Sequence, residues 1–217
     1  MILTPIDRDD LAGALDRFSA GLRDPRSKGV FRQIRRTSPD RAVEPEAERY
    51  RMTVLALARK HGMAVHLPGS RCLFNWDGRA LNGATEAYVI LHEIAHFALA
   101  PPERRGLVDF GLGPGPDTID RAAAERSAAV DLPAREEEEA MASLLGIIWE
   151  ARLNQPALAS FLDQNWLEGL GRSAAPHFSR VLASLWRREL LGDCLVLTRR
   201  RGGCRRRSPG FADKAVV

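Results

Sequence analysis

The stretch that decides the fold runs from residue 88 to residue 111 and reads YVILHEIAHFALAPPERRGLVDFG. Its centre, residues 92–96, is an H-E-x-x-H motif embedded in apolar residues, a pattern that predicts a buried helix. Buried helices seldom carry ionisable side chains unless these are paired or bind a metal. Helix positions four apart share one face, roughly 5–6 Å apart, so His92 and His96 can bind one metal ion. Glu93, about 100° further round the helix, can contact a metal-bound water or a substrate.

A metal ion held by two His side chains needs a third protein ligand, commonly a carboxylate from a later helix. The sequence predicts such a helix over about 135–153, and its start is the acidic run 136–139. We expect Glu136 to be the third ligand, with Glu139 as the next choice. The simpler interpretation is that these acidic residues only stabilise the N-terminal end of a helix. The metal site is expected between the motif helix and this later Glu-bearing helix.

Three other polar residues have side chains of the kind that occur at metal sites. Asp109, in an apolar setting 13 residues after His96, is a candidate metal ligand, an acceptor for the free N–H of a ligand, or an ion-pair partner of a nearby Arg. We take the second role, in which Asp109 orients a ligand His, as the working expectation. His66 alternates with apolar neighbours and is expected to face solvent. His177, on the last predicted helix, is not expected to be a ligand.

Length and composition are typical of one soluble domain, with 217 residues, 45% of them hydrophobic and 28% charged. We expect a single metal-binding domain over residues 1–190 and an Arg-rich, disordered tail over 191–217. No apolar run reaches the roughly 18 residues of a membrane span, and the N-terminus does not resemble a secretory signal. The three Cys residues are odd in number and show no CxxC spacing, which argues against a disulfide framework or a zinc knuckle. Together these features predict a cytoplasmic protein with no membrane partner.

The formal net charge of +4 comes from the tail, where six Arg residues lie between positions 199 and 207. Without them the chain would be slightly acidic, so the basic character does not belong to a folded nucleic-acid-binding face. Nucleic acid is therefore not an expected partner, apart from weak binding by the Arg tail. A non-enzymatic protein that uses this tail on RNA or ribosomes is one alternative to an enzyme.

Hydrophobic periodicity predicts an α+β fold, a mostly helical single domain with a small β-sheet. The polar segments 23–44 and 117–135 are expected to form a loop and a surface segment. The expected helices span 5–22, 45–61, about 85–100, 135–153, 156–164 and 174–190, and the expected short strands span 63–67 and 72–76.

Two His residues and a carboxylate support two different reactions. With Zn²⁺ and Glu93 as general base, the site would hydrolyse peptide bonds. With Fe²⁺, the three ligands would hold one face of an octahedron and leave positions for O₂ and substrate. The local spacing favours a zinc-dependent metallopeptidase. The lack of a third His at the metzincin spacing, of a signal peptide and of a pro-segment argues against it.

Several short motifs accompany the H-E-x-x-H motif between about residues 65 and 185. They are Val65-His66-Leu67-Pro68, Arg104-Arg105, Val108-Asp109-Phe110-Gly111, Pro116-Asp117, an acidic residue in the stretch from Glu136 to Met141, and Asn165-Trp166-Leu167-Glu168-Gly169. Together with the central motif, this set resembles the elongation factor P hydroxylase family of non-haem iron enzymes. After Gly111 the chain differs from the family, because residues 112–116 replace an aromatic segment.

The resemblance implies an Fe(II)/O₂-dependent protein-lysine hydroxylase, that is, a monooxygenase. Its protein substrate would be translation elongation factor P, modified on a lysine, with O₂ as co-substrate and Fe(II) as the metal. Carried over residue by residue, the implied ligands are His92, His96 and Glu136. Glu93 would act beside the metal or on a bound water.

Overall fold

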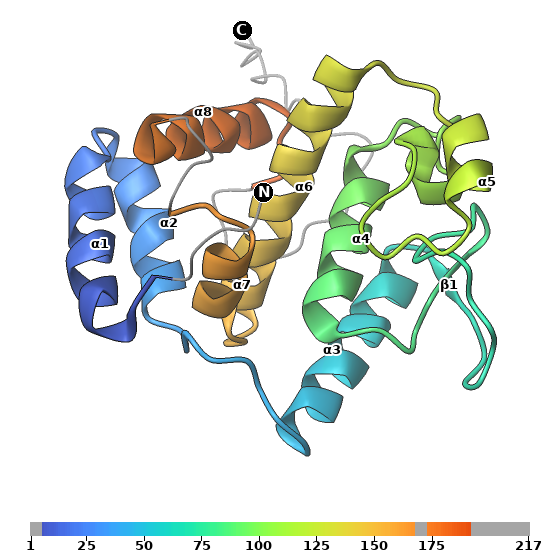
Figure 1. Cartoon of the computed structure of the whole chain (residues 1–217), viewed down its shortest axis with the longest axis horizontal. Coiled ribbons are helices and arrows are strands. Elements are labelled where there is room, and N and C mark those ends of the chain that lie inside the picture. The colour runs from blue at the N-terminus through green and yellow to red at the C-terminus, as the bar shows by residue number, and fades with distance from the viewer. Residues whose placement is uncertain (1–5, 168–172, 192–217) are drawn as a thin grey trace, which may run out of the picture.

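The computed structural model describes residues 6–167 and 173–191, and helices make up most of this part of the chain (Figure 1). Two-residue strands β1 (Ala64–Val65) and β2 (Ala80–Leu81) pair in parallel, with Ala64 opposite Ala80. The expected α+β class, mostly helical with a small sheet, is therefore confirmed. The helices are α1 (Arg8–Gly21), α2 (Pro25–Arg35), α3 (Glu46–Lys60), α4 (Ala87–Leu99), the 3₁₀ helix η1 (Val108–Gly111), α5 (Arg121–Arg126), α6 (Leu132–Arg152), α7 (Ala157–Asp163) and α8 (Ala174–Arg187).

Helix α4, which carries the H-E-x-x-H motif, packs between α6 and α3 near the middle of the molecule (Figure 1). Its apolar residues Ile90, Leu91 and Ile94 are fully buried. Burying each such side chain contributes about 1.5–3 kcal/mol, so packing rather than local propensity holds this helix in place. The helix ends at Leu99, just before Pro101, because the residue before a proline avoids the helical conformation.

A cluster of aromatic rings joins the helices that pack against α6 in addition to α4. Phe18 of α1, Phe31 of α2, Phe161 of α7 and Phe178 of α8 pack with ring centroids 4.6 to 6.5 Å apart. These distances are typical of stabilising aromatic pairs. The cluster joins α1 and α2 to α7 and α8. Of these helices, α2, α7 and α8 also contact α6.

The expectation of a loop over 23–44 was wrong for its first half, where α2 forms. Pro25 occupies the first turn of this helix, a position at which its missing N–H costs nothing. The side chain of Asp24 caps the helix by accepting a hydrogen bond from the backbone N–H of Ser27 at 2.9 Å. Phe31 and Ile34 are buried, so α2 belongs to the core.

The predicted sheet was placed correctly at its first strand and wrongly at its second. β1 lies within the expected 63–67, but residues 72–76 contribute only an isolated bridge from Trp76 to Leu81. The partner strand is β2, beyond the turn at Asp77-Gly78. The segment 117–135 also contains the short helix α5, and α6 begins at Leu132 rather than near residue 135.

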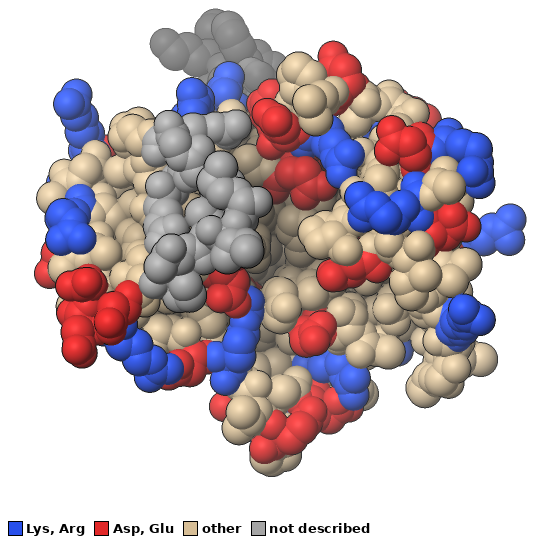
Figure 2. All heavy atoms as spheres, viewed as in Figure 1, with Lys and Arg blue, Asp and Glu red and all other residues tan. Residues whose placement is uncertain are grey.

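No helix in the described ranges combines the length and the apolar character needed to cross a membrane. The predicted tail lies almost wholly outside these ranges, which end at residue 191. Acidic and basic side chains of the described residues are interspersed over the face shown in Figure 2.

Candidate metal centre

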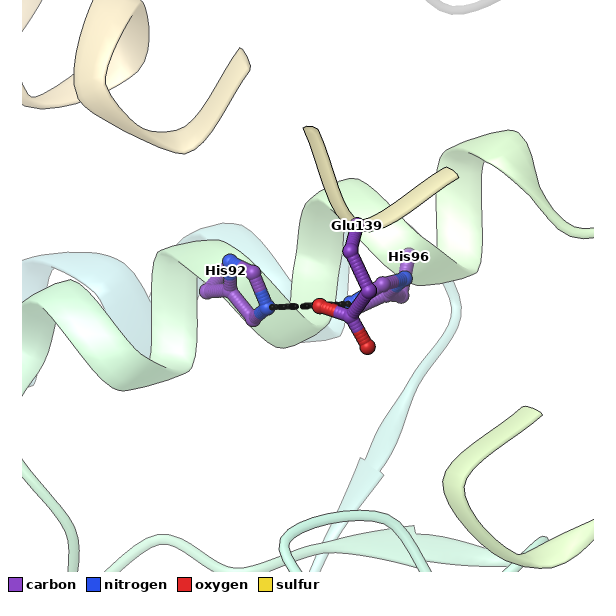
Figure 3. Close-up of side chains that lie close together, drawn as sticks. All are labelled: His92, His96 and Glu139. Atoms are coloured by element: carbon purple, nitrogen blue, oxygen red, sulfur yellow. Dashed lines mark hydrogen bonds and ion pairs between the residues drawn. The ribbon is translucent and has the colours of Figure 1, made fainter. Parts of the chain in front are cut away.

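Three side chains converge at the contact between α4 and α6: His92, His96 and Glu139 (Figure 3). The Nε2 atoms of the two imidazoles lie 2.9 Å apart. Oε2 of Glu139 lies 3.4 Å from each of these nitrogens. His96 is buried, with 4% of its side chain exposed, whereas His92 and Glu139 are 24% and 40% exposed. The site is thus anchored in the core and open on one side.

The spacing of these three atoms fits a single metal ion. Ligands about 2.1 Å from a metal lie about 3.0 Å apart at octahedral angles and about 3.4 Å apart at tetrahedral angles. The three separations of 2.9, 3.4 and 3.4 Å cover both values. Two imidazole nitrogens and one carboxylate oxygen are also the donor set that binds Zn²⁺ or Fe²⁺. The residues therefore fit a divalent ion, and the donor geometry does not select between these two metals.

Gly146 lies on the face of α6 that packs against α4 beside His92. A Cβ at Gly146 would lie 3.4 to 3.5 Å from the backbone of His92 and Leu91, which is ordinary van der Waals contact, so α6 and α4 approach each other closely at this point. Glu139 is seven residues earlier, about two turns, and occupies the same face of α6.

The favoured third ligand, Glu136, is not among the three converging side chains, and the second choice, Glu139, is. Glu136 lies about one further turn from the Gly146 contact, where it lines the cavity beside the site. The candidate ligand set that the structure brings together is therefore His92, His96 and Glu139. These side chains come from the motif helix and the later Glu-bearing helix, between which the metal site was expected.

The residue that faces the second nitrogen of His96 is Glu138, in place of the expected Asp109. Nδ1 of His96 lies 3.7 Å from Oε1 of Glu138, and Arg104 forms an ion pair with the other carboxylate oxygen, Oε2. The ring of Phe110 stacks on His96 with 5.7 Å between centroids. Asp109 therefore neither orients His96 by a hydrogen bond nor pairs with Arg104.

Asp109 still belongs to the site, because it lines the same cavity. Its Oδ2 accepts a hydrogen bond of 2.8 Å from the hydroxyl of Thr118, which itself accepts one of 2.8 Å from the N–H of Gly115. Asp109 and Phe110 both have left-handed backbone angles, with φ of 44° and 55°. Such a conformation is strained for residues other than glycine and often occurs at functional sites.

A cavity of about 710 Å³ opens beside the three ligand atoms. Its size is in the range of ligand-binding pockets, roughly 300–1,000 Å³. The acidic residues that line it are Glu93, Asp109, Asp117, Glu136 and Glu139, and the rings that line it are Tyr88, Phe110, Trp166 and His177 with the two motif imidazoles.

Trp166 and His177 form part of this wall, a position that was not expected from the sequence. Their rings stack at 5.3 Å, and Trp166 Nε1 donates a 2.7 Å hydrogen bond to Ser143. His177 is not one of the converging ligand atoms, in agreement with the expectation. His66 lies apart from the cavity lining and is bonded to Asp77 at 2.8 Å between Nε2 and Oδ2.

The ionisable groups of the site perturb one another. Burial alone would lower the pKa of His96, but the carboxylates of Glu138 and Glu139 outweigh it and raise the pKa to about 10. Burial and the charge of His96 lower the pKa of His92. Burial acts to raise the pKa of Glu139, but its contacts with the two His side chains outweigh burial. The pKa of Glu139 is therefore lowered below its ordinary value. Burial raises the pKa of Glu93 to about 8.

Comparison of the chain with protein-family models, with curated proteins and with solved structures found no match.

Proposed function

We propose that the protein is a mononuclear metal enzyme in which His92, His96 and Glu139 hold one divalent ion. We further propose that the ion is Fe(II) and that the enzyme is an O₂-dependent hydroxylase acting on the modified lysine of elongation factor P. The observation that carries the metal proposal is the convergence of three ligand atoms, 2.9 to 3.4 Å apart, at the wall of a cavity. The sequence motifs described above support the substrate proposal.

The cavity suits a reaction on an inserted side chain. Extended peptides commonly bind by adding a strand to the edge of a sheet. The two short strands of the described residues, β1 and β2, contribute no residue to the cavity wall. A long side chain that enters the cavity, with its backbone outside, is the substrate geometry that this arrangement favours.

In the proposed reaction a C–H bond of the substrate becomes a C–OH bond. One atom of O₂ enters the product and the other leaves as water, so two electrons from an external reductant and two protons complete the balance. Bound iron would supply the position at which O₂ is reduced. The chain itself contributes carboxyl groups: Glu93, beside the ligands, can hold a proton at neutral pH, because burial raises its pKa to about 8.

The test is the intact mass of elongation factor P from the native host, with and without this gene. The expected result is the loss of one oxygen atom's mass in the deletion strain, restored by the wild-type gene. A gene carrying His92→Ala should not restore it, whereas Glu137→Gln, a change at an exposed position on the same helix, should. An unchanged mass, in a host whose factor carries the lysine modification, would refute the hydroxylase proposal.

One observation favours a second candidate, a zinc-dependent metallopeptidase. Glu93 directly follows His92 in the H-E-x-x-H motif and lines the cavity, a position from which its carboxylate can act as a general base on a metal-bound water. Metal analysis of protein purified without oxygen distinguishes the two. Iron with no peptide hydrolysis supports the hydroxylase, and zinc with peptide hydrolysis that is lost in Glu93→Gln supports the peptidase.

A further inference from the structure

Two buried polar atoms beside the metal centre face each other without a hydrogen bond. Among the described residues, four buried side-chain nitrogen or oxygen atoms lack a hydrogen-bond partner, and two of these are Nδ1 of His96 and Oε1 of Glu138. The atoms are 3.7 Å apart. A movement of about half an ångström would bring them within hydrogen-bond distance. Because unsatisfied buried polar groups are costly, the pairing of these two atoms is the arrangement that the site favours.

The guanidinium of Arg104 contacts both residues that lie against His96, Glu138 and Phe110. Arg104 forms an ion pair through Nη2 with Glu138, whose side chain is 11% exposed. Its Nη1 donates a 3.0 Å hydrogen bond to the backbone carbonyl of Phe110, whose ring stacks on His96. The planar fork of an Arg side chain can serve both partners at once, which a Lys ammonium cannot do with the same geometry.

We propose that Glu138 is a positioning residue for the metal site: its Oε1 accepts the proton on Nδ1 of His96, so that Nε2 is left to bind the metal. Arg104 keeps Glu138 in place and orients the Phe110 ring. The inference rests on the metal site proposed above, but not on the identity of the metal or of the substrate. Carboxylate or carbonyl groups commonly hold metal-binding imidazoles in this way.

The two oxygens of Glu138 have different partners, and this makes Glu138→Gln informative. Arg104 only donates, so the amide oxygen of a Gln would face Arg104 and its NH₂ would face His96. An NH₂ group donates to Nδ1, which then carries no proton, and the proton of a neutral imidazole moves to Nε2. The substitution preserves size and shape while favouring the tautomer that cannot bind metal.

The experiment measures Zn²⁺ affinity of the full-length protein by competition with a chromophoric chelator. We expect Glu138→Gln to weaken Zn²⁺ binding by roughly 10–100-fold. We expect Arg104→Lys to weaken it by a smaller factor. Glu137→Gln, the matched change at the neighbouring exposed position, should bind as wild type does. Wild-type affinity in both Glu138→Gln and Arg104→Lys would overturn the inference.

A second readout tests the hydrogen bond itself. In Zn²⁺-loaded wild type with ¹⁵N-labelled His, the Nδ1 proton of His96 should exchange slowly, and in Glu138→Gln that signal should be lost. An unchanged signal would overturn the inference. Should Glu138→Gln fail to fold, the affinity of Arg104→Lys decides the question. Failure of the wild type to bind Zn²⁺ more tightly than His92→Ala would overturn the proposed metal site as well, so the two failures are distinguishable.

Discussion

The guanidinium of Arg41 lies over the ring of Tyr88, with 3.6 Å between its central carbon and the ring centroid. Tyr88 precedes His92 by one helical turn and lines the same cavity. Arg41 comes from the segment between α2 and α3, and it also donates hydrogen bonds to Ser160 at 2.7 Å and to Asp163 at 2.7 and 3.0 Å. One side chain therefore joins the cavity wall to α7.

Replacement of Arg41 by Ala should destabilise the protein while leaving metal affinity unchanged. The cation–π contact contributes about 0.5–2 kcal/mol, and the lost hydrogen bonds add to this. We therefore expect a decrease of about 1–3 kcal/mol in the free energy of unfolding, measured by urea denaturation. Arg8→Ala, at a residue whose side chain is 79% exposed, is the control and should change stability little. Equal stability of the Arg41→Ala and Arg8→Ala proteins would contradict the prediction.

Glu150 should make the stability of the protein depend on pH. Burial raises its pKa from an ordinary value of 4.5 to about 7, even though Ser160 and Arg41 act in the opposite direction. Between these pH values the folded protein holds a proton that the unfolded chain has released, so stability decreases as pH rises. Glu150→Gln imitates the protonated form. The free energy of unfolding of Glu150→Gln should therefore nearly equal that of wild type at pH 4.5. Above pH 7 it should exceed that of wild type by about 3 kcal/mol.

Paired urea denaturations at pH 5 and pH 8 check this prediction. Because both proteins share all other titrating groups, the difference between them isolates the contribution of Glu150. A difference that is the same at both pH values would show that Glu150 does not titrate in this range.

The motif helix and the two His residues of the candidate metal site could be predicted because their signals are local. Helical periodicity and the spacing of His92 and His96 do not depend on the rest of the fold. Helix α2 was missed because Pro25 indicates a loop, whereas at the first helical turn a proline is favourable. The candidate third ligand, Glu139, could not be identified without the tertiary packing of α6. The four consecutive Glu side chains point in different directions around α6, and the packing of α6 against α4 decides which of them reaches the two His residues.

The support of His96 could not be predicted for a related reason. Arg104 and Glu138 are 34 residues apart in the chain, and no periodic pattern connects them. The sequence did indicate that a nearby acidic group would face a ligand His, but the local candidate was Asp109. The left-handed backbone at Asp109 and Phe110 turns the Asp109 carboxylate toward Thr118 instead.

Replacement of the two candidate third ligands should have different effects on metal binding. Glu139→Gln removes a carboxylate that lies 3.4 Å from both imidazole nitrogens, and should weaken Zn²⁺ binding by more than the roughly 10–100-fold expected for a supporting residue. Glu136→Gln removes a carboxylate from the cavity wall and should change Zn²⁺ affinity less than tenfold. The measurement is competition with a chelator at fixed pH. The reverse order of effects would show that Glu136 is the ligand.

Thr118 should hold the turn that carries Asp109. Its hydroxyl donates to Asp109 and accepts from the N–H of Gly115, and the residue is 8% exposed. Thr118→Val keeps the shape but loses both hydrogen bonds, so we expect a destabilisation of about 1–3 kcal/mol and faster amide exchange at Gly115. Thr118→Ser keeps the hydroxyl and should retain the slow exchange. Identical exchange in the Val and Ser variants would refute the role of the hydroxyl.

Metal binding should release a proton, so affinity should increase with pH. In the metal-free protein, the pKa of His96 is about 10, because Glu138 and Glu139 outweigh the effect of burial. The 2.9 Å contact between the two Nε2 atoms then has the imidazolium of His96 donating to His92, whose pKa is lowered. That proton lies where a metal ion would be held, and the two compete. The apparent Zn²⁺ affinity should rise about tenfold per pH unit between pH 6.5 and 8.5. Calorimetry in two buffers of different ionisation enthalpy should show the release of about one proton per bound Zn²⁺. An affinity that does not change with pH would show that the proton and the metal ion do not compete for this position.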